Sequence, residues 1–255
     1  MASGKKKNKM RLDQLLVERG LVESRQKGQA LIMCGLVIVN EQAVTKVGQP
    51  VEIESTIRIK GSDNPYVSRG GLKIEGALKH FEIDPSGFVC LDVGSSTGGF
   101  TDCLLQKGAV KVYALDVGTN QLAWKLRQDE RVVCWEQKHI KELKPEEIVE
   151  NIDLIVIDVS FISLTRVIPY LVPFLEKGAQ MLAMVKPQFE VGKGEVGKGG
   201  VVREEEKQLA AVKNIAEFVQ NEGFKVIDPC KAPIKGPSGN QEYFLLAGGK
   251  LDSVE

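Results

Sequence analysis

The sequence predicts an α/β protein: a mostly parallel, doubly wound sheet with an antiparallel edge hairpin, preceded by a small α+β module. From Tyr66 onward, short apolar runs alternate with helical segments, which is typical of a parallel sheet. The last two runs, 224–234 and 241–249, are joined by GPSGN and can pair as a hairpin at the sheet edge. Residues 1–60 carry 11 Lys and Arg against 6 Asp and Glu, which sets a basic module apart from the acidic remainder.

The basic module begins with residues 1–10, which we expect to be a disordered tail, and continues as a small domain over 11–60. Ser24 is the predicted N-cap of a helix that Gly35 ends. An earlier helix is indicated by leucines with i, i+3, i+4 spacing: Leu12, Leu15 and Leu16. Strands are predicted over 36–40 and 51–60.

A turn-rich linker over 61–67 leads into the larger domain, residues 68–255. That domain begins with a helix over 70–81, whose apolar side chains share one face. Its parallel strands are predicted at 88–93, 111–117, 131–135, 153–158 and 179–186. Further helices are predicted over 163–176 and 204–222.

Composition argues against several classes of protein. The five Cys are scattered without a C-x-x-C pair, so we expect buried thiols in a reducing cytoplasm, and no metal site. No apolar stretch follows the basic start, and no run is long enough for a membrane helix, so neither a signal peptide nor membrane insertion is expected. The basic module suggests a polyanion partner, although a solvated lysine tail explains part of its charge.

The segment LDVGSSTGGFTD carries the clearest ligand-binding pattern. Asp92 ends a strand, Gly94 permits a tight turn, and two further glycines open a helix whose first amides can face a ligand. Asp116 closes the next strand and suits two ribose hydroxyls. NAD binding is an alternative, but the loop lacks the G-x-G-x-x-G motif typical of NAD-binding proteins. The predicted cofactor residues are Asp92, Gly94, Ser95, Ser96, Thr97, Gly98, Gly99, Asp116 and Val117.

Several motifs, taken in order, resemble those of one family. The D-x-G-S-S-x-G-G-F-T-D run is similar to the S-adenosylmethionine loop of FtsJ-like RNA ribose methyltransferases. Residues 11–50 look like an S4-like RNA-binding domain. The TlyA family, often labelled hemolysin, is then matched by YVSRGGLK, DVSFISL, VKPQFEVGKGEVGKGGVVR and GNQEYFL. The resemblance runs from residue 11 to about residue 248.

This resemblance implies a Rossmann-like class I methyltransferase sheet and S-adenosylmethionine as the cofactor. The implied activity is methyl transfer to cytidine 2′-hydroxyls of ribosomal RNA. The implied partner is that RNA within ribosomal subunits, with no stable protein partner. The family's Lys-Asp-Lys-Glu set matches Lys73, Asp158, Lys186 and Glu242.

The chemistry of this set also follows from its residue types. Asp158 and Lys186 end predicted strands, where open α/β sheets bind ligands. A 2′-hydroxyl loses a proton as it attacks a methyl group, and a neutral lysine can accept that proton. Lys186 is our candidate base, and Lys73 either promotes its deprotonation or steers the ribose. Asp158 and Glu242 are expected to orient the two amines, and the base role stays open between the lysines.

RNA contacts are predicted at helix starts and just beyond the linker, from Arg11, Ser24, Arg25, Lys27 and Arg69. The run FEVGKGEVGKGG comes close to a P-loop, but Gly199 stands where a Ser or Thr would hold Mg²⁺. The next helical pattern begins only near Glu204. We therefore interpret 188–203 as a mobile glycine-rich loop beside Lys186, which clamps the RNA backbone through Lys193, Lys198 and Arg203.

One segment departs from the family pattern. After the third strand of the larger domain, relatives tend to carry a Glu-Arg-Thr-Asn-like run, whereas this chain has Glu136-Gln137-Lys138-His139. If this segment touches adenine, His139 stands where Asn would. The departure bears on the adenine contacts and leaves the fold prediction unchanged.

Three other functions compete with RNA methylation. A membrane-active hemolysin needs a signal, a long apolar segment or a toxin-like repeat, and the sequence has none of these features. An RNA-binding assembly factor with a vestigial methyltransferase domain is disfavoured by the intact loop and the complete catalytic set. An NAD enzyme is disfavoured because the loop lacks the G-x-G-x-x-G motif.

Overall fold

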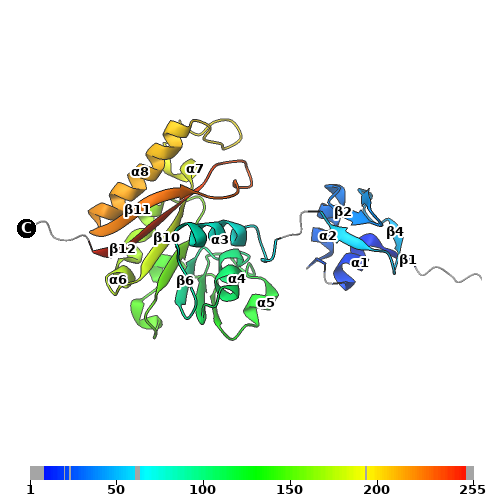
Figure 1. The fold of residues 1–255 in the computed structure, drawn as a ribbon, viewed down its shortest axis with the longest axis horizontal. Helices are drawn as coiled ribbons and strands as arrows, with labels where there is room; N and C mark the ends of the chain where they lie inside the picture. Colours follow the sequence, from blue (N-terminus) through cyan, green and yellow to red (C-terminus); the bar gives the residue numbers. More distant parts are fainter. Residues whose placement is uncertain (1–8, 20, 23, 61–63, 193, 251–255) are drawn as a thin grey trace, which may run out of the picture. The chain divides into compact units, whose positions relative to one another are not determined.

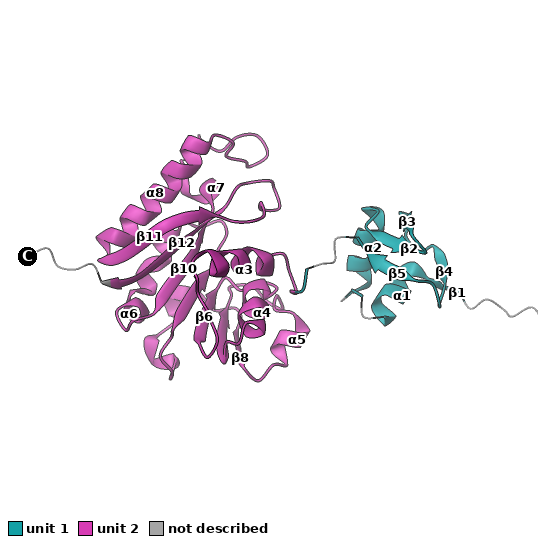
Figure 2. Cartoon of the chain, in the orientation of Figure 1, with its two compact units in different colours: residues 1–65 teal, residues 66–255 magenta. Residues whose placement is uncertain are grey.

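The computed structural model describes residues 9–19, 21–22, 24–60, 64–192 and 194–250. The chain divides into two compact units, Met1–Pro65 and Tyr66–Glu255 (Figure 2). We call them unit 1 and unit 2 and describe each by itself.

Unit 1 packs two helices, α1 (Leu12–Glu18) and α2 (Arg25–Met33), against short strands. A three-stranded sheet has the order β3-β2-β5, from Gln42–Val44, Val37–Val39 and Ile57–Ile59. A second sheet pairs β1 (Lys9–Arg11) with β4 (Pro50–Glu52). The predicted leucine face of α1 is confirmed, because Leu12, Leu15 and Leu16 are buried in one core with Ile32 and the strand valines.

Two predictions for unit 1 are wrong in detail. The strand over 51–60 is broken by a turn in which the Ser55 amide donates to the Glu52 carbonyl at 2.9 Å. Its halves, β4 and β5, therefore pair with different partners, β1 and β2. The end of the predicted tail, Lys9–Met10, belongs to β1, while residues 1–8 lie outside the described residues.

Unit 2 contains a seven-stranded sheet of order β11-β12-β10-β9-β6-β7-β8 (Figure 1). The strands are β6 (Val89–Val93), β7 (Lys111–Leu115), β8 (Val132–Trp135), β9 (Leu154–Ile157), β10 (Gln180–Val185), β11 (Phe224–Lys231) and β12 (Tyr243–Lys250). Strands β6 to β10 pair in parallel, and β12 runs antiparallel to both β10 and β11. The predicted mostly parallel sheet with an antiparallel edge hairpin is confirmed.

Helices cover both faces of this sheet, as expected for a doubly wound fold. One core cluster packs α3 (Gly70–His80) and α4 (Gly99–Gln106) onto one face. The other cluster packs α6 (Val172–Leu175) and α8 (Glu205–Asn221) onto the opposite face. Short helices α5 (Trp124–Arg127) and α7 (Pro187–Glu190) lie in the loops after β7 and β10. The 3₁₀ turns are Ile140–Glu142, Pro145–Glu147, Leu164–Arg166 and Ile168–Tyr170.

The predicted single helix over 163–176 is wrong. The segment forms two 3₁₀ turns and the four-residue helix α6. Pro169 and Pro173 interrupt it, because proline lacks the amide hydrogen that a continuous helix needs and its ring crowds the preceding turn.

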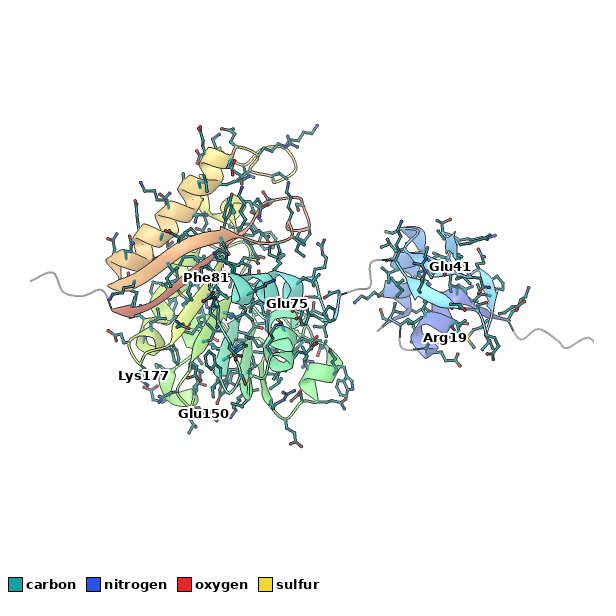
Figure 3. The ribbon with its side chains drawn as sticks, in the orientation of Figure 1. Arg19, Glu41, Glu75, Phe81, Glu150 and Lys177 are labelled. Carbon is teal, nitrogen blue, oxygen red and sulfur yellow. The ribbon has the colours of Figure 1, made fainter. Side chains whose placement is uncertain are left out.

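The chain order reverses where β6 lies between β7 and β9, which is where open α/β sheets bind ligands at their carboxyl ends. Glu150 and Lys177 precede β9 and β10, and so belong to the opposite, amino edge (Figure 3). The carboxyl edge carries the loops described next.

Candidate active site

The loop after β6 depends on backbone shapes that glycine allows. Gly94 has a φ of 85°, and a Cβ there would lie 2.9 Å from the Asp158 carbonyl oxygen. Gly98 has a φ of 94° and precedes α4, and a Cβ there would lie 2.3 Å from a Leu126 methyl. Any larger residue at either position would strain the backbone and displace its neighbour.

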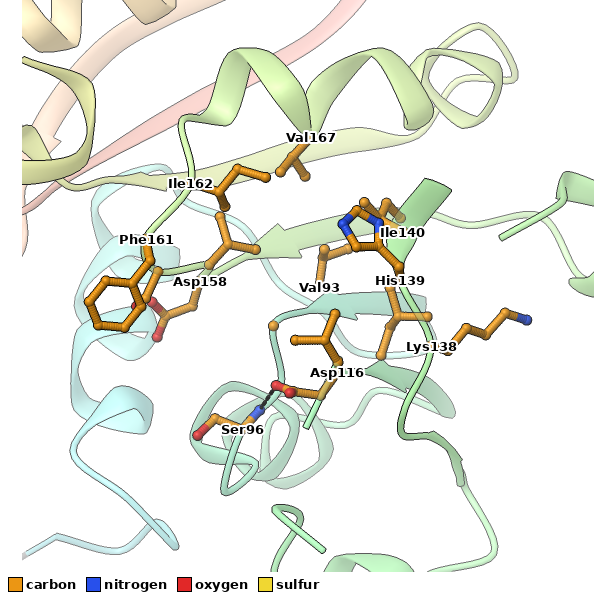
Figure 4. Close-up of a pocket in the computed structure, with 15 residues that line it drawn as sticks. Val93, Ser96, Asp116, Lys138, His139, Ile140, Asp158, Phe161, Ile162 and Val167 are labelled. Atoms are coloured by element: carbon orange, nitrogen blue, oxygen red, sulfur yellow. Dashed lines mark hydrogen bonds between the residues drawn. The ribbon is translucent and has the colours of Figure 1, made fainter. Parts of the chain in front are cut away.

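A cavity of about 520 Å³, which we call the cofactor cavity, opens at the carboxyl ends of β6, β7 and β9 (Figure 4). Asp116 and Ser96 lie on one wall, and both Asp116 oxygens accept backbone amides, from Ser96 and Gly118, at 2.7 Å each. His139 lies at one end of the cavity and Asp158 at the other. The fixed Asp116 carboxylate keeps further lone pairs for hydroxyl donors.

A smaller cavity of about 240 Å³ lies beside the same loop. It shares Gly94, Ser96 and Asp158 with the cofactor cavity. Between them, the two cavities are lined by these predicted cofactor residues: Gly94, Ser95, Ser96, Thr97, Gly99, Asp116 and Val117.

Asp92 and Gly98, the two remaining predicted cofactor residues, line neither cavity. Asp92 is fully buried behind the loop, where its Oδ2 accepts the Thr101 amide at 3.0 Å and the Thr101 hydroxyl at 2.6 Å. Burial raises the pKa of Asp92 to about 7, although the Thr101 hydrogen bonds oppose that shift. Asp92 therefore secures the start of α4, and Gly98 shapes the turn.

A third cavity of about 430 Å³, the catalytic cavity, brings together all four residues of the predicted Lys-Asp-Lys-Glu set. Lys73 Nζ lies 2.5 Å from Glu242 Oε2, and Lys186 Nζ lies 2.6 Å from Asp158 Oδ1. Lys73, Lys186 and Glu242 are buried. Burial raises the pKa of Asp158, although Lys186 and Lys73 act against that shift. Asp158 and Ser96 line all three cavities, so the cavities meet at these two residues.

Sequence reasoning missed two residues of this site. Lys186 Nζ donates a hydrogen bond to Ser160 Oγ at 2.8 Å. The Phe161 side chain is 90% exposed, and its ring packs 5.1 Å from that of Phe189. Both residues line the cofactor and catalytic cavities, and their position just after Asp158 was the available signal.

The glycine-rich loop ends beside the catalytic cavity. Asn240 Nδ2 donates to the Gly200 carbonyl, and Asn240 Oδ1 accepts the Val202 amide, at 2.9 Å each. Gly200 lines the cavity together with Glu242. The Gly-Lys pair stands in a turn and not at a helix start, so the segment has no P-loop geometry. Lys198 and Arg203 are exposed, and Lys193 lies outside the described residues.

Two of the predicted RNA contacts of unit 1, Arg11 and Arg25, bind a buried carboxylate. Asp13 is fully buried and accepts from Arg11 at 3.1 Å, Arg25 at 2.7 Å and Gln29 at 2.9 Å. These hydrogen bonds, above all from Arg11, hold the pKa of Asp13 well below its usual range. Arg11 and Arg25 remain about half exposed, at 46% and 48%.

The other predicted RNA contacts lie on two helix starts. Ser24 is confirmed as an N-cap, since its hydroxyl accepts the Lys27 amide at 3.2 Å. Lys27 is exposed on the first turn of the same helix. Arg69 precedes α3 in unit 2, where it is exposed and lines the smaller cavity.

The segment that departs from the family pattern shapes the rim of the cofactor cavity. Glu136 accepts amides of the loop before α5, from Asn120 at 2.6 Å and Gln121 at 2.8 Å, and pairs with Arg127. These partners, Arg127 first, hold the pKa of Glu136 at about 2. His139 lines the cavity, and its Nδ1 accepts the Lys141 amide at 3.1 Å.

Comparison with known proteins places this site in a family. The model of the FtsJ-like methyltransferase family matches residues 66–249, and that of the S4 domain matches residues 10–57. A relative from Mycobacterium tuberculosis, the 16S/23S rRNA (cytidine-2′-O)-methyltransferase TlyA, is 44% identical over 95% of this chain and 91% of its own length. The chain belongs to the TlyA family of FtsJ-like methyltransferases.

Other members of the TlyA family carry a different kind of name. Hemolysin A of Brachyspira hyodysenteriae is 43% identical over 92% of this chain and 98% of its own length. A solved structure from Streptococcus thermophilus, also named for a hemolysin, has a TM-score of 0.75 and 41% identity over 97% of this chain and 90% of that one. In the part of the chain that the structure describes, no helix has the length and apolar character needed to span a bilayer.

Proposed function

We propose that the chain transfers a methyl group from S-adenosylmethionine to the ribose 2′-hydroxyl of cytidine in ribosomal RNA. The observation that carries this proposal is the pair of lysine–carboxylate contacts in a cavity that shares Ser96 and Asp158 with the cofactor cavity. S-adenosylmethionine, the methyl donor of this family, supplies an activated methyl group on a sulfonium.

The residues of the cofactor cavity fit this donor. The Asp116 carboxylate, at the end of β7, is fixed by two amides and retains lone pairs for two ribose hydroxyls. Asp116 and Asp158 both line the cavity, and their negative charges favour a cationic ligand. Small residues at 94–97 leave room for the ligand against the backbone amides.

The catalytic cavity supplies the base. As the ribose oxygen bonds to the methyl carbon, its proton passes to the lone pair of a neutral lysine. Bound S-adenosylmethionine would supply that methyl group and keep the electron pair of the broken carbon–sulfur bond on its sulfur. Lys186 acts as this base, since Asp158 holds its amine at 2.6 Å at the junction of the cavities. Lys73, held at 2.5 Å by Glu242, steers the ribose.

RNA recognition is assigned to basic residues in both units. The S4 domain match and the half-exposed Arg11 and Arg25 support phosphate contacts by unit 1. Arg69 beside the smaller cavity, and Lys198 with Arg203 beyond the catalytic cavity, support contacts close to the reacting ribose. The substrate is ribosomal RNA within ribosomal subunits in the cytoplasm, by analogy with the relative named for 16S and 23S rRNA.

The test is methyl transfer from tritiated S-adenosylmethionine to isolated 30S and 50S subunits that lack the modification, each assayed separately. We expect label at a cytidine 2′-oxygen of one or both subunits, and its loss in Lys186→Ala. Lys177→Ala, at the amino edge of the sheet, is the matched control and keeps wild-type activity. If the wild-type protein binds the donor but labels neither subunit, the chain is a binding factor and not an enzyme.

A further inference from the structure

One residue outside the Lys-Asp-Lys-Glu set touches a lysine of that set. Lys186 Nζ lies 2.8 Å from Ser160 Oγ and 2.6 Å from Asp158 Oδ1. Ser160 follows Asp158 by two positions on the loop after β9, and it is exposed where the cofactor and catalytic cavities adjoin. The contact therefore lies at the place where a methyl group must cross from donor to ribose.

The two lysines are held differently. Lys73 is bound by the Glu242 carboxylate at 2.5 Å, and no hydroxyl contact to Lys73 is found among the described residues. Lys186 donates a hydrogen bond to the Ser160 hydroxyl and forms an ion pair with the Asp158 carboxylate, whose Oδ1 accepts no hydrogen bond from a described residue. A lysine nitrogen has four tetrahedral positions, and one is always taken by its own carbon. The Ser160 hydroxyl occupies a second position and so fixes the rotation of the amine.

We infer that Ser160 is a positioning residue, whose hydrogen bond to Lys186 fixes the rotation of the amine so that the lone pair of its neutral form is aimed at the substrate hydroxyl. After proton transfer that lone pair becomes the third N–H of the ammonium. With Asp158 alone, the amine rotates about its last carbon–nitrogen bond and the lone pair is aimed only part of the time. This inference rests on the proposed function.

The experiment compares single-turnover methyl transfer by wild-type protein, Ser160→Ala and Ser160→Thr over pH 6–10, on the subunit that the wild type labels. Ser160→Ala should transfer methyl about 10-fold more slowly, a cost typical of a misaimed catalytic group. Its affinity for S-adenosylmethionine, measured by calorimetry, should stay within about twofold. Ser160→Thr keeps the hydroxyl and should restore most of the rate.

The pH profile separates positioning from a structural role. The ionisable groups that face Lys186 in the cavity are Asp158 from the loop after β9, Lys73 from α3 and Glu242 from the segment before β12, and all are unchanged in these variants. Loss of Ser160 removes an acceptor from the ammonium, so the pH of half-maximal rate should move to lower values. Thr165→Ala is the matched control, because its hydroxyl lies on the same loop and contacts Ser163.

Each outcome decides between the alternatives. Equal rates and equal half-maximal pH in wild type and Ser160→Ala would overturn the inference while leaving the proposed function intact. So would a slower Ser160→Ala whose profile is unmoved and which Ser160→Thr fails to rescue. A wild type that labels neither subunit removes both proposals at once. A slower, pH-shifted alanine variant rescued by threonine supports positioning by Ser160.

Discussion

Two clusters of buried charge in this molecule use similar ingredients with opposite effects. In unit 1, Asp13 accepts from Arg11, Arg25 and Gln29, and its pKa lies well below the usual range. In unit 2, Asp158 has Lys186 as its ion-pair partner, and burial raises its pKa. Several donors to one carboxylate outweigh desolvation at Asp13, whereas the Lys186 ion pair beside the catalytic cavity lets desolvation prevail at Asp158.

The comparison teaches how to separate a structural charge cluster from a reactive one. Arg11 and Arg25 are about half exposed, so the cations of unit 1 keep much of their hydration and remain able to meet phosphates. Lys186 is buried beside a cavity, where its polar contacts are Asp158 and Ser160. A buried charged group with several polar partners, which we call saturated pairing, forms a stable cluster. One with few partners, which we call sparse pairing, can exchange a proton.

The largest effect is expected from removing Lys186, the sparsely paired lysine of unit 2. Lys186→Met should lower the methyl-transfer rate by about 1,000-fold, since general-base catalysis commonly contributes that much. Single-turnover assays on isolated subunits measure it, with calorimetry to check donor binding. A Lys73→Met variant that loses more activity than Lys186→Met would instead assign the base role to Lys73.

The next effect concerns the saturated cluster in unit 1. Asp13→Ala should lower the free energy of unfolding of unit 1 by about 2–3 kcal/mol, because several charge-assisted hydrogen bonds are lost together. Chemical denaturation of the full chain, followed by signals from each unit, measures the loss. The donor affinity of unit 2 should not change, and a loss there would contradict the separation of the two clusters.

The direction of the Asp13 pKa shift decides how the stability of unit 1 depends on pH. The pKa of Asp13 is lower in the folded state than in the unfolded chain, so its stabilising contribution is full above about pH 4 and is lost as pH falls further. Wild-type unit 1 should therefore lose stability below about pH 4, and Asp13→Ala should show a flatter profile. Parallel acid titrations of both proteins by circular dichroism would show whether the two profiles differ.

A smaller effect is expected at Asp92, whose pKa is raised to about 7 by burial. The folded state holds this proton more tightly than the unfolded chain, so stability from this group is full below about pH 4 and falls as pH rises to about 7. Asp92→Asn should therefore raise the melting temperature of unit 2 by about 2–4 °C at pH 8. At pH 4 the gain should vanish, and a gain of equal size at both pH values would refute the argument.

The smallest effect is expected from removing Arg25, one of the hydrogen-bond donors to Asp13. Arg25→Ala leaves Asp13 bound to Arg11 and Gln29, so the loss of stability should be about 0.5–1 kcal/mol. If Arg25 contacts a phosphate, the variant should bind RNA more weakly. The slope of its log binding constant against log salt concentration should also fall by about 1. Salt titrations of RNA binding provide the measurement, with Glu18→Gln of α1 as the control.

Much of this protein could be predicted from the order of residues alone. The parallel strands, the Gly-rich turn after β6, the antiparallel end and the N-cap at Ser24 are local patterns, and the structure confirms them. Local patterns also misled: one helix was predicted over 163–176 where prolines break it, and alternation at 51–60 suggested one strand across a turn. The roles of the cofactor, catalytic and RNA-binding residues remain predictions.

Only the tertiary structure decided which side chains meet. Lys73 and Glu242 are 169 positions apart, and no periodicity predicts their 2.5 Å contact. The Ser160 hydroxyl on Lys186, the sharing of Asp13 by two arginines, and the place of Asp92 behind its loop likewise emerge only when the elements pack. Backbone propensity acts over a few neighbours, whereas pairing and desolvation depend on what the folded chain brings alongside and hides from water.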